Sequence, residues 1–397
     1  MGFIGNIIMA GAVHHHNHRR NGISHRLFGA VPNTGNVVIC GGDTTSEESF
    51  ATDIKVDSLI ESIVQAAKDH KPTICIYSDD SITPDILDLL NDDSLKDSIC
   101  FFGHSYSYIP FDKNVDSHKV EEMMRGIVNR YNKNNNSYGD TIQTIMSMMI
   151  DILKKCFSKE YFTYSNLANI INNFMTSNGE DVFLDWLAGE TTANLTPFEN
   201  RITIKWDVAI NEFQSFWTSL DSEVNVHQNN NLKKRSAFSC LLDNKVCIFR
   251  LSSNYSKNMV ELLLNELAFY KDVRQNYTLI NYNVDISVVS NYRLLDAGRS
   301  IIIGNTLDSI GMKEYNPPRS SFVSLGITNE EAMDIFKKMV ASGWWTEVMM
   351  GFGHHAHVEF APKHQEPIPP DVLVNIRDGS AYVISPERYT QVDIMFA

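Results

Sequence analysis

The chain alternates between short β-branched runs and stretches whose apolar residues recur at helical spacing. Apolar runs bounded by glycine or polar residues are typical of strands buried in a sheet. Apolar residues three and four positions apart indicate helices that pack on such a sheet. We predict strands at 37–39, 71–80, 98–102, 245–251, 277–283, 300–304 and 322–325, and helices at 57–67, 258–270, 288–297 and 328–342.

The middle of the chain, from 118 to 223, follows the helical period almost throughout. One apolar face spans Val120 to Tyr131 and another spans Ile142 to Leu153, and a polar loop is predicted at 132–137. We interpret this block as an all-α insertion in an α/β domain. It adds helices at 165–175 and 206–220 and ends in a polar, basic linker at 228–235. The predicted organisation is an N-terminal segment at 1–30, an α/β part at 31–117, the all-α insertion at 118–230 and a second α/β part at 231–397.

A glycine-containing loop follows the first predicted strand and leads into a helix. A functional P-loop reads G-x-x-x-x-G-K-[ST], where the lysine contacts phosphate and the hydroxyl holds Mg²⁺. Counting from Gly41 places Glu47 at the lysine position, and counting from Gly42 places Glu48 there, so a glutamate replaces the lysine in either case. We therefore predict a P-loop NTPase-like fold, with a mostly parallel central sheet flanked by helices, whose nucleotide-binding loop is degenerate. The residues of that loop are Gly41, Gly42, Asp43, Thr44, Thr45, Ser46, Glu47, Glu48 and Ser49.

Two carboxylates, Asp79 and Asp80, end the predicted strand at 71–80. In that position they are candidates to hold a metal ion or to activate water. They are equally placed to cap the next helix, because Thr83, Pro84 and Asp85 follow as a helix start.

Composition narrows the classes of function. The chain has 34 Lys and Arg against 48 Asp and Glu, a net charge of −14 at pH 7. Phosphate contacts need clustered cations, so general nucleic-acid binding is not expected.

The six cysteines form no C-x-x-C pair, which favours buried free thiols in a reducing compartment. The apolar run at 2–13 is shorter than the ~20 residues that span a bilayer and lacks the basic start of a secretory signal. We predict a cytoplasmic protein, held at the inner face of a membrane only through partners.

The order of these elements resembles the cytoplasmic domain of the coupling ATPases of type IV secretion and conjugation, which belong to the FtsK- and HerA-like class. The resemblance covers roughly 30–390 and rests on a few positions in a fixed order. They are the loop after 37–39, the Ser78-Asp79-Asp80 strand end, the Ile109-Pro110-Phe111 turn, the helical insertion, the Asp296-Ala297-Gly298-Arg299 segment and the closing stretch 370–383. It implies an all-α domain at one mouth of a hexameric ring.

The departures from that family fall on its chemistry. The resemblance implies an Asp-Glu pair after the strand at 277–280, for Mg²⁺ and for the attacking water, but Asn281 and Tyr282 stand there. Neither side chain is a useful general base at neutral pH. Asn305 stands near a position where the family has a glutamine that senses the γ-phosphate. Arg299 resembles an interface arginine, although a buried ion pair would equally explain it.

These departures favour a pseudo-ATPase that acts as a structural or adaptor component of a secretion or conjugation machine. The alternative is an active ATP-driven translocase of DNA or protein that uses substituted residues such as Asp79 and Asp80. We expect no cofactor beyond a weak or vestigial ATP–Mg²⁺ site. The expected partners are other subunits of a ring-shaped ATPase or secretion complex and a protein or protein–DNA cargo.

A separate metal site is conceivable near the end of the chain. On a strand, His355, His357 and Glu359 share one face, and two histidines with a carboxylate can bind zinc or iron(II). The polar outer face of an ordinary strand explains the same pattern. The neighbouring pair Trp344 and Trp345 is interpreted as core or subunit interface.

Overall fold

The computed structural model of the 397-residue chain describes a defined set of segments. These are residues 36–42, 48–135, 139–251, 257–273, 276–286, 298–311, 320–325, 327–328, 330–333, 370–374, 380–384 and 389–393.

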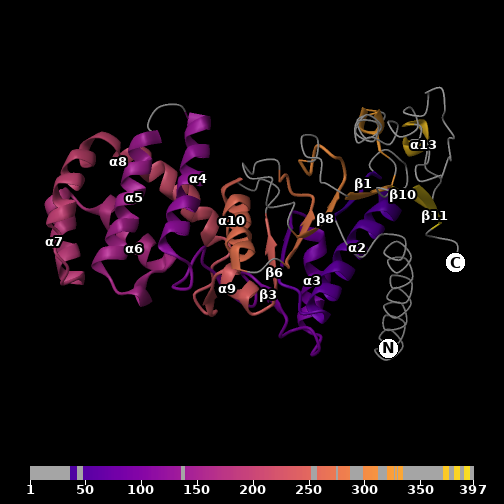
Figure 1. Ribbon diagram of the computed structural model, residues 1–397, viewed down its shortest axis with the longest axis horizontal. Helices are drawn as coiled ribbons and strands as arrows, with labels where there is room; N and C mark the ends of the chain where they lie inside the picture. Colours follow the sequence, from indigo (N-terminus) through magenta and orange to yellow (C-terminus); the bar gives the residue numbers. More distant parts are fainter. Residues whose placement is uncertain are drawn as a thin grey trace, which may run out of the picture.

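One sheet of nine strands forms the centre of the described part of the chain (Figure 1). Its order is β11-β10-β9-β1-β8-β7-β2-β6-β3. The strands from β9 to β3 pair in parallel, whereas β10 pairs antiparallel with both β9 and β11. The bounds are β1 Asn36–Cys40, β2 Thr73–Tyr77, β3 Ile99–Phe101, β6 Val246–Arg250, β7 Thr278–Tyr282, β8 Arg299–Gly304, β9 Ser320–Ser324, β10 Ser380–Ile384 and β11 Tyr389–Asp393.

This topology confirms the predicted α/β class with a mostly parallel central sheet. The strand predicted at 37–39 is β1, which lies inside the sheet between β8 and β9. A strand covered on both faces reads as a continuous apolar run, and all five residues of β1 are buried.

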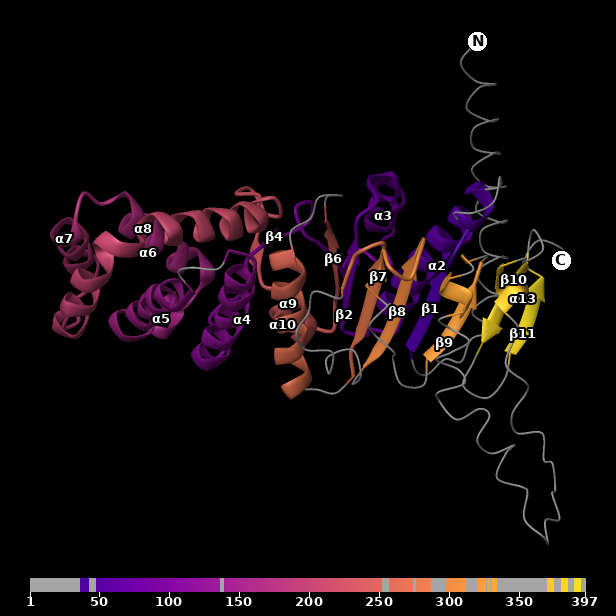
Figure 2. The same cartoon turned by 90° about the horizontal axis from the view of Figure 1, so that it is seen from above.

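Helices cover both faces of the sheet (Figure 2). Side chains alternate along each strand, so Val37 and Ile39 of β1 enter one core and Val38 and Cys40 enter the other. The first core packs against α2 (Glu48–Lys68) and α3 (Thr83–Leu90), which follows the short 3-10 helix η1 (Asp80–Ile82). The opposite core contains α9 (Ala237–Leu242), α10 (Lys257–Val273) and part of α13 (Pro370–Val374).

Helices α4 to α8 lie together at the end of the molecule away from β10 and β11, and we call them the helical end (Figures 1 and 2). A two-stranded pair of β4 (Ser107–Tyr108) and β5 (Lys234–Arg235) connects the helical end to the sheet, so the predicted linker at 228–235 ends in a strand. The bounds are α4 Ser117–Asn135, α5 Gly139–Cys156, α6 Tyr164–Thr176, α7 Glu180–Glu190 and α8 Thr196–Asn225, with a 3-10 helix η2 at Lys159–Tyr161.

The core on the α10 side continues into the helical end without a break. Phe249 of β6 stacks on Phe102 at 4.5 Å between ring centroids and meets Tyr108 edge-on at 5.0 Å. Further along the same core, Tyr164 of α6 stacks on Trp217 of α8 at 5.7 Å. Aromatic pairs of this kind add to the stabilisation that comes from burial alone.

Most predicted elements occur, with shifted ends. The helix predicted at 57–67 begins at Glu48, and the polar loop predicted at 132–137 is wrong for its first residues, because α4 continues to Asn135. Helix propensity is a weak guide at such ends. A reciprocal capping box begins the helix predicted from residue 328: Glu331 N donates to Thr328 Oγ1 at 3.3 Å, and Thr328 N donates to Glu331 Oε2 at 3.1 Å. The predicted helix at 288–297 lies outside the described residues.

All six cysteines are buried free thiols, as predicted. Within the described ranges, no helix combines the length and the apolar character that crossing a bilayer requires.

Candidate functional site

Parallel strands present their carboxyl ends at one edge of a sheet, which is where α/β proteins bind ligands. In register, Cys40 of β1 lies beside Gly304 of β8, and Tyr282 of β7 lies beside both Ile303 of β8 and Tyr77 of β2. The residues that follow these strand ends are therefore neighbours. We call them the carboxyl edge: Gly41, Ser78, Asn283 and Asn305.

A buried lysine on α2, which the sequence did not single out, contacts the carboxyl edge. Lys55 lies in the second turn of α2, and its side chain is only 1% exposed. Its Nζ donates to the Gly41 carbonyl at 3.1 Å and to Asn305 Oδ1 at 2.5 Å. Side chains on a helix tilt toward its N-terminus, so a residue in the second turn can serve the loop that precedes the helix. A cation therefore lies at this loop, although the P-loop lysine position does not supply it.

Geometry explains the two glycines that begin the loop. Gly41 and Gly42 have φ of +116° and +93°, in a region that L side chains rarely adopt. A Cβ on Gly42 would lie 2.1 Å from the Cβ of Ala51 on α2. The close approach of loop and helix thus requires glycine at 42 whether or not a phosphate binds.

The amide groups of the carboxyl edge bond to one another. Asn283, which has φ of +53°, accepts a hydrogen bond from Asn305 N on its Oδ1 at 3.0 Å. Ser78 Oγ donates to the Asn283 carbonyl at 2.6 Å, and Gly41 N donates to the Asn305 carbonyl at 3.2 Å. These bonds tie together the ends of β1, β8, β7 and β2.

The residues at the expected Asp-Glu positions have other structural roles. Asn281 is fully buried, and its side chain closes the turn after β7: Nδ2 donates to the Val284 carbonyl at 2.8 Å, and Val284 N donates to Oδ1 at 3.2 Å. Tyr282 is 1% exposed and lies in the core beneath α2 and α3. Both positions therefore stabilise the fold around the strand end.

Asp79 and Asp80 have separate environments. Asp79 is the N-cap of η1, where its Oδ1 accepts from Ser81 N at 2.9 Å and from Ser81 Oγ at 2.7 Å. This cap precedes α3, whose own N-cap, Ile82, contributes no side-chain bond. Asp80 Oδ1 lies 3.6 Å from Arg250 Nε, and both side chains are largely exposed. An exposed ion pair of this kind contributes at most about 1 kcal/mol.

Arg299 lies at the opposite end of β8 from Asn305, where it pairs in register with Thr278, the first residue of β7. Burial lowers the pKa of its guanidinium, and Asp69 partly offsets that effect. Its buried Nε has no hydrogen-bond partner among the described residues. Arg299 and Asn305 are thus not brought together in one chain.

Several sequence candidates fall outside what the structure describes. Residues 43–47 of the degenerate loop are not described, so the position of Glu47 stays a prediction. Glu48 and Ser49 are described only as the first helical residues of α2. His355, His357 and Glu359 also lie outside the described residues. In the described part of the chain, no three His, Cys, Asp or Glu side chains gather as a metal site would require.

One signal in the sequence pointed to Lys55. The apolar positions Leu59 and Ile63 mark the buried face of α2, and Lys55 lies four and eight residues before them on that same face. A lysine is almost never fully buried without partners, so a lysine on such a face indicates a specific contact. The role of Asn283 had no comparable signal, because its hydrogen-bond partners lie at the ends of two other strands, β2 and β8.

The sequence matches no protein-family model and none of the curated proteins. A search of solved structures finds the plasmid coupling protein TrwB in complex with ADP and Mg²⁺, at 11% identity and a TM-score of 0.50, over 91% of this chain and 86% of that one. A trigonal form of the coupling protein TrwBdeltaN70 in complex with sulphate matches at 12% identity and a TM-score of 0.46, over 94% and 86%. At such identity the first match shows the fold alone. The resemblance to coupling ATPases is thus confirmed as a likeness of fold.

Proposed function

We propose that this chain uses the fold of a conjugative coupling protein without its hydrolytic chemistry, as a structural or adaptor component of a type IV secretion or conjugation machine. In this proposal 31–117 and 231–397 form the α/β body, and 118–230 form an all-α insertion whose helices share a core with that body. Its partners are other subunits of a ring-shaped ATPase or secretion complex and their protein or protein–DNA cargo. It works in the cytoplasm and reaches the membrane only through those partners.

One observation carries the proposal: the carboxyl edge is closed by its own hydrogen bonds. Phosphoryl transfer needs a carboxylate for Mg²⁺ and a group that positions the attacking water. At these strand ends the chain places the amides of Asn281, Asn283 and Asn305, all of them bonded within the protein. An amide cannot take up the proton that a general base must remove.

Charge in the loop supports the same conclusion. A glutamate at 47 would face the triphosphate where a P-loop lysine normally stands. Two like charges about 4 Å apart repel by about 4 kcal/mol at an effective dielectric near 20. The Lys55 ammonium offsets part of this repulsion, but it already bonds to Gly41 and Asn305. We infer at most a weak ATP–Mg²⁺ site.

Three measurements on the purified chain test the proposal together: Mg²⁺-dependent ATP hydrolysis, equilibrium binding of ATP with and without Mg²⁺, and the mass of the assembly. We expect no turnover above background, and no gain in ATP affinity when Mg²⁺ is added. Turnover by the chain alone would contradict the proposal. Turnover only in a mixed assembly with an active relative would fit an adaptor.

A second candidate function, an active translocase with substituted residues, is favoured by the cation that Lys55 brings to the loop. In that case Asp79 or Asp80 at the end of β2 would hold the metal. Asp79→Ala would then abolish turnover, whereas Asp69→Ala, on the loop between α2 and β2, would leave it unchanged. If the chain hydrolyses ATP and the Asp79→Ala and Asp69→Ala variants have the same turnover, Asp79 does not hold the metal.

A further inference from the structure

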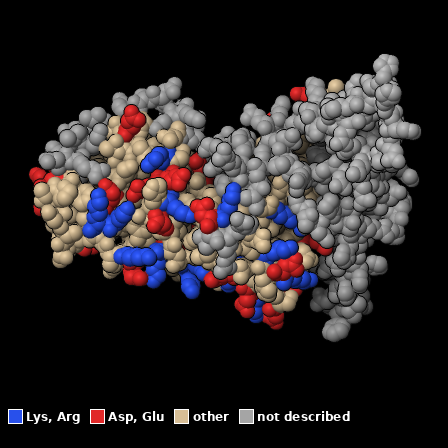
Figure 3. Space-filling model, viewed as in Figure 1, with Lys and Arg blue, Asp and Glu red and all other residues tan. Residues whose placement is uncertain are grey.

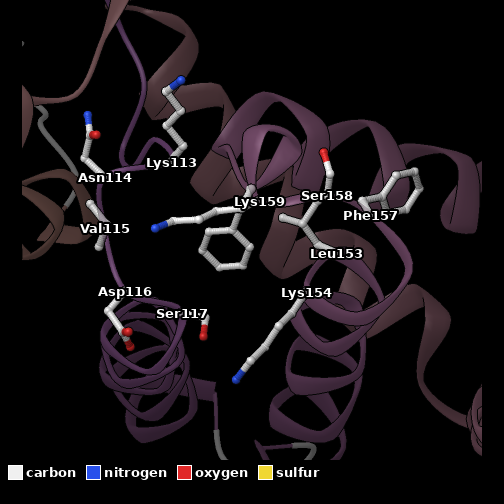
Figure 4. A pocket seen from close by; sticks show the side chains of 11 residues that line it. Lys113, Asn114, Val115, Asp116, Ser117, Leu153, Lys154, Phe157, Ser158 and Lys159 are labelled. Carbon is white, nitrogen blue, oxygen red and sulfur yellow. The ribbon is translucent and has the colours of Figure 1, made fainter.

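A cavity of about 340 Å³ lies at the base of the helical end (Figure 4). One wall is the segment 113–117, which leads into α4, and the other is built from the end of α5 and from η2, between 153 and 162. We call it the lysine pocket. Its volume falls in the usual range of small-molecule sites. None of the carboxyl-edge residues lines it, so it is a separate feature of the molecule.

Positive charge dominates the lining of the lysine pocket. Lys113, Lys154 and Lys159 line it against a single acid, Asp116, although the whole chain carries a charge of −14. Lys113 bonds to Glu160 and points away from the cavity. Lys159 extends toward Val115 and Lys154 extends toward Ser117, so both ammonium groups reach across the space between the walls (Figure 4).

Few acids compensate these two lysines. Lys154 Nζ lies 3.9 Å from Glu121 Oε1, at the outer limit of an ion pair, and Lys159 has no ion-pair partner among the described residues. Asp116 has another role, because its Oδ1 accepts from His118 N at 2.8 Å and so caps α4. Two cations facing one cavity repel each other until an anion lies between them.

The base of the lysine pocket is apolar. Val115, Leu153 and Phe162 are 5%, 1% and 6% exposed, and the half-buried Phe157 completes the apolar surface. The hydroxyls of Ser117 and Ser158 also line the cavity and can donate hydrogen bonds. The combination of cationic rim, hydroxyl donors and aromatic base suits a ligand with one anionic end and one planar or apolar end.

We propose that the lysine pocket binds a phosphate monoester of a planar or apolar group, with its oxygens between Lys154 and Lys159 and its other end on Phe157 and Phe162. A phosphate monoester carries close to two negative charges at pH 7, which matches two ammonium groups better than a single carboxylate does. This inference does not depend on the proposed function, because no residue of the carboxyl edge takes part.

Calorimetric titration of the full chain with phenyl phosphate tests the proposal, with inorganic phosphate and phenol as half-ligands. We expect phenyl phosphate to bind more tightly than either half, and its affinity to fall as salt rises. AMP and phosphotyrosine amide then distinguish the two sources of such a group, a free nucleotide-like ester and a modified protein side chain. Tighter binding of either one supports the pocket and identifies its source.

Matched variants locate the binding. Lys154→Gln and Lys159→Gln should each weaken phenyl phosphate binding by roughly tenfold, as expected for the loss of a charge-assisted hydrogen bond. Lys155→Gln is the control, because Lys155 adjoins Lys154 in sequence but pairs with Asp151 and lies outside the lining. Asp116→Asn retains a residue able to cap α4 and removes the one negative charge, so it should strengthen binding several-fold.

The opposite sign expected for Asp116→Asn makes the test sharp. No binding of phenyl phosphate up to about 10 mM, a level weaker than most specific sites, would overturn the proposal. So would equal affinities for the Lys159→Gln and Lys155→Gln variants, or weaker binding by Asp116→Asn. The presence or absence of ATP binding and turnover at the carboxyl edge does not change these results, because the two sites share no residue. The lysine-pocket inference and the proposed function can therefore fail separately.

Discussion

At the scale of single residues, Lys55 is the side chain on which the carboxyl edge depends most. It joins the loop after β1 to the loop after β8 through two acceptors, the Gly41 carbonyl and Asn305 Oδ1. Both acceptors lie near the α2 face of the sheet, where water has little access. The residue therefore holds together the region in which an ATPase would hold nucleotide.

Replacing Lys55 by methionine should lower the free energy of unfolding by about 1–3 kcal/mol, because buried acceptors lose their donor while the packing volume stays similar. Urea denaturation followed by far-UV circular dichroism measures the change. Lys68→Met is the control, since Lys68 is exposed at the end of the same helix and its loss should cost less than about 0.5 kcal/mol. Equal effects in the two variants would mean that the Lys55 contacts are dispensable.

Gly42→Ala should lower the free energy of unfolding by about 2–4 kcal/mol, from overpacking against Ala51 together with left-handed backbone strain. The matched variant is Gly189→Ala in α7, where an added Cβ meets nothing within 4 Å. Alanine there should be neutral or stabilise by up to about 1 kcal/mol. Thermal and urea unfolding of the two variants measure the difference, and similar stabilities would mean that the loop moves away from α2 to make room for the added Cβ.

The hydrogen bonds within the carboxyl edge could not be predicted from the sequence, although some of its residues could be named. The sequence singles out Gly41 and Gly42 as glycines directly after a buried strand, and it singles out Asn305 only through the resemblance to a family with a glutamine near that position. The contact between Lys55 and Asn305 joins positions 250 residues apart, and only the parallel register of β1 and β8 brings them together. The use of Asn281 in closing the turn after β7 depends on backbone geometry that composition does not encode.

At the scale of elements, a buried histidine lies at the junction between α8 and β4, where the helical end meets the sheet. His227, just after α8, is 4% exposed and lies edge-on to Phe249 at 5.7 Å between ring centroids. Its carbonyl accepts from Tyr108 N at 2.9 Å. Burial, with a smaller contribution from Arg250, lowers the pKa of His227 to about 4.

This burial gives the junction a defined pH dependence. Above pH 6.5 the imidazole is neutral in both the folded and the unfolded chain, so its full contribution is present. Between about pH 6.5 and 4 the unfolded chain takes up a proton that the folded chain refuses, so stability falls as the pH falls. We expect this loss to approach about 3 kcal/mol at pH 4, at 1.36 kcal/mol per pKa unit.

The variant His227→Phe should lack that loss, because it keeps an aromatic ring and removes the titrating group. Free energies of unfolding measured from pH 7.5 to 4.5 for both proteins isolate the effect by difference, whatever other groups titrate. Parallel curves for the wild type and His227→Phe would contradict the assignment.

Elements were easier to predict than their ends. The helix α6 (Tyr164–Thr176) and the strand β7 (Thr278–Tyr282) agree with the predicted ranges to within about one residue, because their apolar period is strong. The first turns of α2 were missed, since Glu48 to Lys55 carry polar residues on a helix whose burial is set by the sheet below it. Tertiary packing overrides local propensity at such places.

At the scale of the whole molecule, one core is shared by the sheet and the helical end. Separate domains would instead be expected to have separate cores joined by an exposed linker. On the face seen in Figure 3, acidic and basic side chains alternate across the helical end and form no continuous basic band.

We expect the sheet and the helical end to unfold in one cooperative transition. Two buried thiols report on the two parts: Cys75 in β2 and Cys156 at the end of α5. Thiol labelling along a urea series, read peptide by peptide with mass spectrometry, should give the same midpoint for both. Labelling of Cys156 at clearly lower urea than Cys75 would mean that the helical end unfolds independently despite the shared core.

The contact between Gly42 and Ala51 also bears on how relatives of this chain should be read. Substitutions at positions that once met a phosphate can accumulate freely when no ligand needs them, but a side chain at 42 would collide with a helix that the sheet holds in place. Descendants that have lost every trace of energy transduction would still keep this glycine. In such sequences a glycine at this position indicates the shape of the turn, and it does not indicate that the protein hydrolyses ATP.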